Sequence, residues 1–178
     1  MCSLSKDILK MLNEQVSLEA SSSASYLSMA AWCDIRGLCG SAAYLYNHSE
    51  EERKHMLKIF HYISDAGGIA LSPEVTNIKN DFSGLSDIFS YALDSEVAVT
   101  ESISKLVDCS FTIKDFTTFN FLQWFVSEQR EEEMITRKAF GLFSMFGADK
   151  NNGTNHLYII DRAIGKLKSH KLDVREYA

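Results

Sequence analysis

The sequence predicts an all-α protein, a four-helix bundle with one long crossover and a short fifth helix near its C-terminus. Helix breakers are rare, with one proline and nine glycines in 178 residues, and this scarcity favours long helices. Apolar residues recur at alternating steps of three and four along four long segments, as on the buried face of a helix. Two connections between these segments are short and one is long, which indicates the topology.

Each expected helix ends at a break in this apolar periodicity. Gly37 and Gly40 lie in the first turn, Gly67 and Gly68 end the second helix, and the stretch GADKNNGTN at 147–155 precedes the fifth. Together the helices are expected to form a single domain over the whole chain, residues 1–178. The expected helices cover residues 5–34, 41–65, 85–110, 115–146 and 156–169.

The connection lengths predict how the helices run. Short turns make the first and second helices, and the third and fourth, antiparallel hairpins. The segment from Gly67 to Gly84, which holds the only proline, Pro73, is long for a connection in a compact domain. Such a crossover is needed when the second and third helices lie parallel and the chain must return along the bundle.

Composition excludes several classes of protein. The net charge is −6, from 18 Lys and Arg against 24 Asp and Glu, which argues against a nucleic-acid partner and favours the attraction of cations. No apolar run is long enough to span a membrane, and the N-terminal MCSLSKDILK does not resemble a signal peptide. The cytoplasm is the expected location, with a processed organellar form as the alternative.

The four cysteines lie at positions 2, 33, 39 and 109, and no pair has the C-x-x-C spacing of a structural zinc site. We interpret them as free thiols in a reducing compartment.

Glutamates occupy inward-facing positions near the middle of every long helix. Any one of them alone would more often be a solvated boundary residue. Mid-length positions of an up-down bundle meet at one height, however, and a group of buried carboxylates would repel one another or take up protons. Cations at the centre remove both problems, so the pattern predicts metal binding. The glutamates are Glu19, Glu52, Glu96, Glu128 and Glu132.

The ligand types indicate which metal is bound. Carboxylates with one imidazole, His55, and no thiolate disfavour structural zinc, and an all-oxygen calcium site would not need the histidine. Several glutamates together with an E-x-x-H pair, here Glu52 and His55, are typical of a pair of iron ions. One bridging carboxylate, Glu52, can hold the two ions close together.

The sequence resembles a non-haem ferritin of the bacterial type, from about Asp7 to Leu167. The resemblance rests on the stretches LNEQVSLE, AWC, EEERKHM, TFNFLQW and VSEQREEE, of which the last three are long and specific. It implies a ferritin-like fold, and it implies that Glu19, Glu52 and His55 bind the first iron of a ferroxidase centre. It further implies that Glu52 bridges to a second iron, completed by Glu96 and Glu132.

The resemblance also implies further residues around this centre. Gln129 is expected near the second iron, Tyr26 beside the centre in a role in oxidation, and Trp124 as a nearby aromatic. Each aromatic has a simpler interpretation as part of the core, with the Tyr26 hydroxyl bonded to a carboxylate. A third iron site is implied at Glu51, Glu128, Glu131 and Glu132.

Two residues of this implied third site, and two histidines, also have simpler interpretations. Glu51 and Glu131 lie in acidic runs whose ordinary interpretation is a solvated helix face. His48 and His61 are interpreted as surface histidines or as histidines satisfied by their own contacts.

The sequence differs from bacterioferritins, rubrerythrins and many di-iron oxygenases at two places, and these differences argue against membership in those families. Residues 128–131 read E-Q-R-E, where bacterioferritins, rubrerythrins and many di-iron oxygenases carry a second E-x-x-H. Bacterioferritins place a haem-binding methionine directly after the bridging glutamate, and this chain has Arg53 there, so no haem is expected.

The resemblance implies iron storage and detoxification, with Fe(II) oxidised by O2 or H2O2 at the di-iron centre and stored as a ferric mineral. It also implies a hollow shell of 24 subunits with the fifth helix at the four-fold axes. Two alternatives stay open. One is a di-iron peroxidase or oxygenase of the rubrerythrin-like type without mineral storage, and the other is a shell subunit without a catalytic centre.

Overall fold

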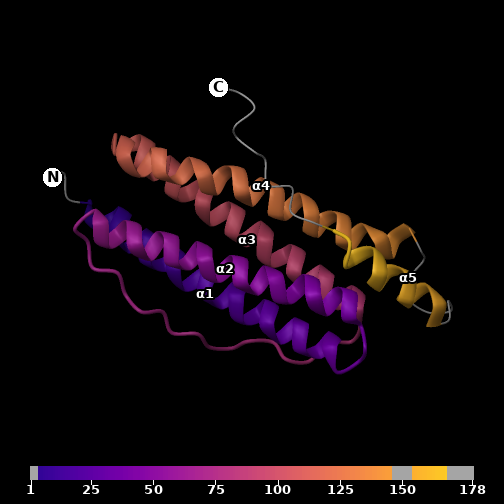
Figure 1. The fold of residues 1–178 in the computed structure, drawn as a ribbon. Helices are drawn as coiled ribbons and strands as arrows, with labels where there is room; N and C mark the ends of the chain where they lie inside the picture. Colours follow the sequence, from indigo (N-terminus) through magenta and orange to yellow (C-terminus); the bar gives the residue numbers. More distant parts are fainter. Residues whose placement is uncertain (1–3, 146–153, 168–178) are drawn as a thin grey trace.

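The computed structural model describes residues 4–145 and 154–167, and this part of the chain folds into five helices without strands. The four long helices form a bundle, and the fifth lies at the end where α2 begins and α4 ends (Figure 1). The predicted fold class is confirmed. The helices are α1 (Lys6–Asp34), α2 (Cys39–Asp65), α3 (Leu85–Thr112), α4 (Phe116–Met145) and α5 (Thr154–Ile164).

The helix ends differ from the sequence expectation by a few residues. α2 begins two residues earlier, at Cys39, α3 continues to Thr112, and α5 begins at Thr154. The expected end of the fourth helix at 146, most of the break at 147–155 and the expected end of the fifth helix at 169 lie outside the described residues.

Local capping explains where the helices start. The Ser5 hydroxyl accepts a hydrogen bond from the Ile8 N–H at 3.2 Å and begins α1. The Asp115 carboxylate accepts one from the Thr118 N–H at 3.1 Å and begins α4. The turn before α4 contains Lys114 at φ 62°, a left-handed conformation that is uncommon for a residue other than glycine.

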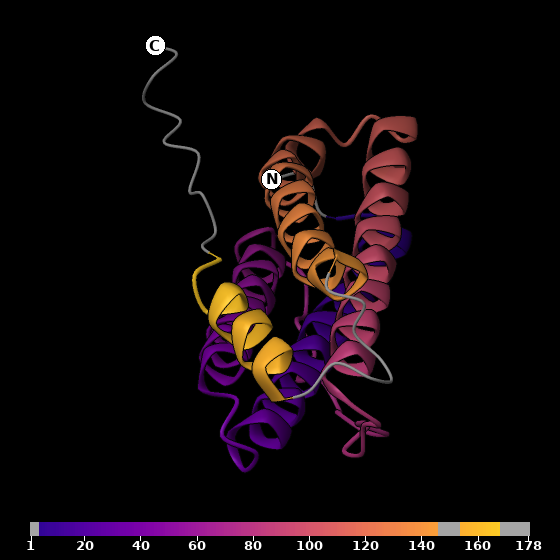
Figure 2. The same ribbon diagram turned by 90° about the vertical axis from the view of Figure 1, so that its right-hand side faces the viewer.

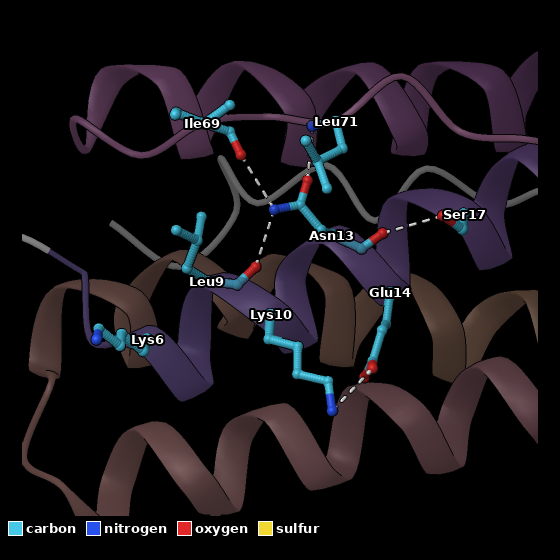
Figure 3. Close-up of a pocket in the computed structure, with 8 residues that line it drawn as sticks. All are labelled: Lys6, Leu9, Lys10, Asn13, Glu14, Ser17, Ile69 and Leu71. Carbon is cyan, nitrogen blue, oxygen red and sulfur yellow. Dashed lines mark hydrogen bonds and ion pairs between the residues drawn. The ribbon is translucent and has the colours of Figure 1, made fainter.

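The crossover between α2 and α3 runs the length of the bundle, as its length predicts (Figure 1). It is fixed to α1 by the amide of Asn13, which donates to the Ile69 carbonyl at 3.1 Å and accepts from the Leu71 N–H at 2.8 Å (Figure 3). Further along, the Ser28 hydroxyl donates to the Lys79 carbonyl at 2.8 Å. These bonds let an otherwise irregular segment satisfy its backbone groups at the surface.

The apolar core is divided into two clusters, one toward each end of the bundle. One cluster contains Leu12, Ile59 and Leu122, and the other contains Met29, Leu45 and Phe89. The buried mid-helix glutamates lie between the two clusters. Apolar packing on both sides therefore holds four helices in register around a polar layer.

α5 is attached to the bundle by a carboxylate that caps another helix. α2 has no side-chain cap of its own at Leu38. Instead, the buried Asp161 of α5 accepts hydrogen bonds from the Gly40 N–H at 3.0 Å and the Ser41 N–H at 2.7 Å. A negative charge is favourable at a helix N-terminus, and Figure 2 shows α5 lying against α2. This contact also explains the early start of α2.

Gly40→Ala is expected to displace α5, because a Cβ at this position would lie 2.2 Å from the Asp161 carbonyl oxygen. Overpacking and the loss of two capping bonds should lower stability by about 2 kcal/mol. Thermal unfolding followed by circular dichroism measures the effect. Gly141→Ala is the matched control, because a Cβ there meets no atom within 4 Å, and it should raise stability by about 0.5–1 kcal/mol. Equal midpoints for the two variants would contradict the role of this contact.

Candidate metal centre

One glutamate from each long helix is buried in the polar layer at the middle of the bundle. Glu19, Glu52, Glu96 and Glu132 are each 1% exposed, which rules out the interpretation of solvated boundary residues. They come from α1, α2, α3 and α4 respectively. The structure therefore places the predicted carboxylates at a common height in the bundle.

Glu19, Glu52 and His55 form a group whose ligand atoms all lie within 4.8 Å of one another. The His55 Nδ1 is 3.5 Å from the Glu52 Oε2 and 4.0 Å from the Glu19 Oε2. Both carboxylate oxygens of Glu52 and the Oε2 of Glu19 are buried without a hydrogen-bond partner among the described residues. Unsatisfied buried oxygens are costly, and a cation would satisfy them.

Glu96 is held differently, because both of its oxygens accept hydrogen bonds. The Tyr26 hydroxyl donates to the Oε1. The Gln129 amide donates to the Oε2 at 2.6 Å and to the Glu96 backbone carbonyl at 3.1 Å. Gln129 and Tyr26 thus both contact Glu96 and orient its carboxylate.

Two more groups extend the centre toward the surface. His55, Glu128 and Glu132 form one, and His48, Glu51 and Glu132 form the other. Glu51 and Glu128 are half-buried, so their helix face is not simply solvated. Glu131 is also largely buried on α4, although it does not belong to any of the three groups found among the described residues.

His48 is the residue that the sequence reasoning missed. It is buried rather than at the surface, with its Nδ1 at 3.0 Å from the Glu132 Oε2 and 3.7 Å from the Glu51 Oε2. The signal available in the sequence was its position four residues before Glu52 on the same helix face. His61, by contrast, is exposed.

Trp124 packs beside the centre rather than in the middle of the core. Its ring lies edge-on to the His55 ring, with centroids 5.4 Å apart. The Lys58 ammonium sits 3.7 Å from the Trp124 ring centroid. Trp124 therefore covers His55 and presents its outer face to a surface cation.

The electrostatics of the carboxylate cluster favour bound protons or cations. Burial, and then the charge of Glu52, raises the pKa of Glu19 well above its usual range. Burial, and then the charge of Glu96, does the same to the pKa of Glu52. Burial raises the pKa of Glu96 to about 7. Burial lowers the pKa of His48, but the carboxylates of Glu132, Glu96 and Glu51 together more than offset this, so that its pKa lies above its ordinary value.

The donor set fits divalent metal. Carboxylate oxygens and imidazole nitrogens are the ligands of iron and similar ions in helix bundles, and the unsatisfied oxygens of Glu19 and Glu52 point to a cation between the helices. The fold and this cluster define the protein as a helix-bundle carboxylate protein with groups that could hold metal ions.

The comparisons with known proteins agree with this class. The family model described as a ferritin-like domain matches residues 9–145. A bacterial non-heme ferritin of Campylobacter jejuni is 38% identical over 92% of this chain and 96% of its own length. A probable bacterial non-heme ferritin-like protein of Haemophilus influenzae is 36% identical over 93% of this chain and 98% of its own length.

Solved structures give the same answer. An open pore ferritin from the archaeon Archaeoglobus fulgidus superposes with a TM-score of 0.87 at 32% identity, over 94% of this chain and all of that one. A ferritin of Chlorobium tepidum gives 0.79 at 37% identity, over 90% of this chain and 97% of that one. The chain belongs to the ferritin family, and its resemblance to bacterial non-haem ferritins is confirmed. Within the part of the chain that the structure describes, no helix has the length and hydropathy to cross a membrane.

Proposed function

We propose that this protein is an iron-storage ferritin that oxidises its substrate Fe(II) at the buried centre. The observation that carries the proposal is the pair of open oxygens on Glu52, buried among Glu19, His55 and the carboxylates of α3 and α4. One carboxylate with both oxygens available can bridge two ions. The family assignment supports the same conclusion.

The residues divide between two substrate sites. Glu19, Glu52 and His55 bind the first Fe(II), and Glu52 with Glu96 and Glu132 binds the second. The carboxylates neutralise the ions and, as hard anionic ligands, favour Fe(III) over Fe(II). Each Fe(II) gives up one electron, and O2 takes both electrons with two protons to form H2O2, or H2O2 takes both with two protons to form water.

A third site lies on the outer side of this pair. The sequence resemblance assigns it to Glu51, Glu128, Glu131 and Glu132, and we add His48 because its Nδ1 faces both Glu51 and Glu132. The half-buried position of Glu51 and Glu128 suits a site that exchanges ions with solvent.

Storage requires an enclosed volume, so the proposal includes a shell of 24 subunits. The relatives named as ferritins over nearly the full chain support it. Sedimentation velocity of the purified protein tests this step, and a profile of monomer and dimer alone would contradict it. We also propose a cytoplasmic location, which suits the free thiols of Cys33, Cys39 and Cys109.

A rubrerythrin-like di-iron peroxidase or oxygenase is the alternative, and it is disfavoured by E-Q-R-E at 128–131. Iron loading separates the two. A storage protein given Fe(II) in large excess over its sites, in air, should retain the oxidised iron through gel filtration. An enzyme of the alternative class should retain only its site iron and consume peroxide continuously with an added reductant.

Tyr26→Phe is expected to slow Fe(II) oxidation by about 10-fold, a typical effect of losing a group that orients a metal ligand. The hydroxyl is lost from the Glu96 Oε1, while the ring and its packing remain. Stopped-flow absorbance measures the rate. Tyr44→Phe is the matched control, because its hydroxyl lies near Thr136 instead of Glu96. An unchanged rate in Tyr26→Phe would make Tyr26 only a core aromatic.

A further inference from the structure

A chain of two hydrogen bonds leads from α3 to the first substrate site. The Ser102 hydroxyl donates to the Gln15 Oε1 at 2.5 Å. The Gln15 amide nitrogen then donates to the Glu19 Oε1 at 2.8 Å. Gln15 is fully buried on α1, one turn before Glu19, and Ser102 is half-buried on α3. The chain therefore joins two helices behind a carboxylate of the centre.

This chain leaves one particular oxygen of Glu19 available. The Oε1 is occupied by Gln15, while the buried Oε2 is without a hydrogen-bond partner and lies on the side of His55, 4.0 Å from its Nδ1. A carboxylate fixed at one oxygen loses its freedom to rotate, so less entropy remains to be lost when the other oxygen binds an ion.

The Gln15 amide is held in one orientation by the Glu19 carboxylate at its donor end and by the Ser102 hydroxyl at its acceptor end. A glutamine amide has an acceptor end and a donor end, and the Ser102 hydroxyl contacts the Oε1 end. Reversing the amide would place its oxygen against the Glu19 carboxylate, which is unfavourable. Glu96 has no comparable open oxygen, because Tyr26 and Gln129 occupy both of its oxygens.

We propose that Gln15, oriented by Ser102, is a positioning residue that presents the Oε2 of Glu19 to the metal ion bound by Glu52 and His55, and so sets the affinity of that site. The inference rests on the proposed function, because it requires the cluster to bind metal. The metal affinity of the Glu19 site therefore depends on Gln15 and Ser102, whereas the metal affinity of the site formed by Glu96 and Glu132 does not.

The test is calorimetric titration of the metal-free protein with Co(II), a divalent probe that does not undergo the oxidation step. Glu19→Ala identifies the binding event that belongs to the Glu19 site. In Gln15→Met and Ser102→Ala, that event should weaken by about 10- to 100-fold and by about 3- to 10-fold, the range for groups that orient a metal ligand. The event assigned to Glu96 and Glu132 should stay within about 2-fold.

Two further variants separate positioning from general damage to the helix. Ser102→Thr keeps the hydroxyl and should restore the parent affinity. Ser104→Ala removes another α3 hydroxyl, which bonds the Thr100 carbonyl at 2.8 Å and no other group in the described part of the chain, and should leave both events unchanged. Because both events are read in the same molecule, a loss confined to one of them does not come from reduced folding.

The possible outcomes separate a failure of this inference from a failure of the proposed function on which it rests. A parent that binds both Co(II) ions, with Gln15→Met and Ser102→Ala binding equally well or losing both events together, overturns the positioning role alone. A parent that binds no Co(II), or binds it identically after Glu19→Ala, overturns the metal centre and the inference with it. Selective weakening with rescue by Ser102→Thr supports the proposal.

Discussion

Glu52→Ala is expected to abolish rapid Fe(II) oxidation, with a fall in the initial rate of at least about 100-fold. Even residues that only orient a metal ligand contribute about 10- to 100-fold to metal affinity or activity, and Glu52 is itself a proposed ligand. Glu52 is the only glutamate of the cluster with both oxygens unsatisfied among the described residues. Its removal therefore takes a ligand from both of the proposed substrate sites at once. Stopped-flow absorbance in the near-ultraviolet, after mixing with Fe(II) in air, measures the rate.

The matched control for this variant is Glu101→Ala, which removes the same charge from an exposed position on α3. It should oxidise Fe(II) at the parent rate. If the two variants lose activity equally, the general negative charge of the chain would account for oxidation, and the assignment of Glu52 as the bridge would be wrong.

The metal-free protein is expected to lose stability as the pH rises from 5 to 8. The folded-state pKa values of Glu19, Glu52 and Glu96 are raised above 4.5, so the folded chain binds more protons than the unfolded chain in this window. Stability then falls with rising pH. Glu96 alone, with its pKa raised to about 7, contributes a loss of about 2–3 kcal/mol between pH 5 and pH 8.

The remaining shifted groups act in the same direction or outside this window. The raised pKa of His48 means that its contribution is also present at low pH and lost as the pH rises. The pKa of Asp87 is lowered, chiefly by the Ser83 N–H, so its contribution is lost only in more acidic solution. Denaturant unfolding of chelator-treated protein at pH 5, 6, 7 and 8 measures the trend.

A divalent cation should reverse that loss. Co(II) is expected to bind only the folded cluster and to neutralise its carboxylates, so the unfolding free energy at pH 8 should rise with the Co(II) concentration. The double variant Glu19→Gln, Glu52→Gln should be flatter with pH and insensitive to Co(II). Stability of the chelated parent that rises toward pH 8 would show that these carboxylates are not strained by burial.

Much of this molecule could be predicted from regular patterns in its sequence. The long apolar stripes predicted the bundle, and the segment from Gly67 to Gly84 predicted the crossover. The mid-helix glutamates could be recognised because each interrupts an apolar stripe, which is rare unless a cation is bound. The spacing of Glu52 and His55 added the histidine.

The features that the sequence did not predict depend on contacts between distant segments. Asp161 caps α2 from a position 120 residues away from Ser41, and nothing near Leu38 indicates such a partner. Ser102 resembles any other serine on a helix until its bond to Gln15 is seen. His48 was missed because a single histidine on a stripe is ambiguous until the Glu132 carboxylate is found beside it.

The buried glutamates of the polar layer do not add to the stability of the fold. The two apolar clusters would join into one core if Glu19, Glu52, Glu96 and Glu132 were apolar. Such replacements of buried charges are often neutral or stabilising. The buried carboxylates are explained by metal binding rather than by folding.

The most direct test of the central claim is the stoichiometry of the fast oxidation phase. Fe(II) is added in air at increasing ratios to protein, and the amplitude of the fast absorbance change is recorded by stopped flow. A di-iron centre predicts an amplitude that rises linearly to about two Fe(II) per chain and then stays constant, with no fast phase in Glu52→Ala. An amplitude that keeps rising without a break, and equally in both proteins, would contradict the account.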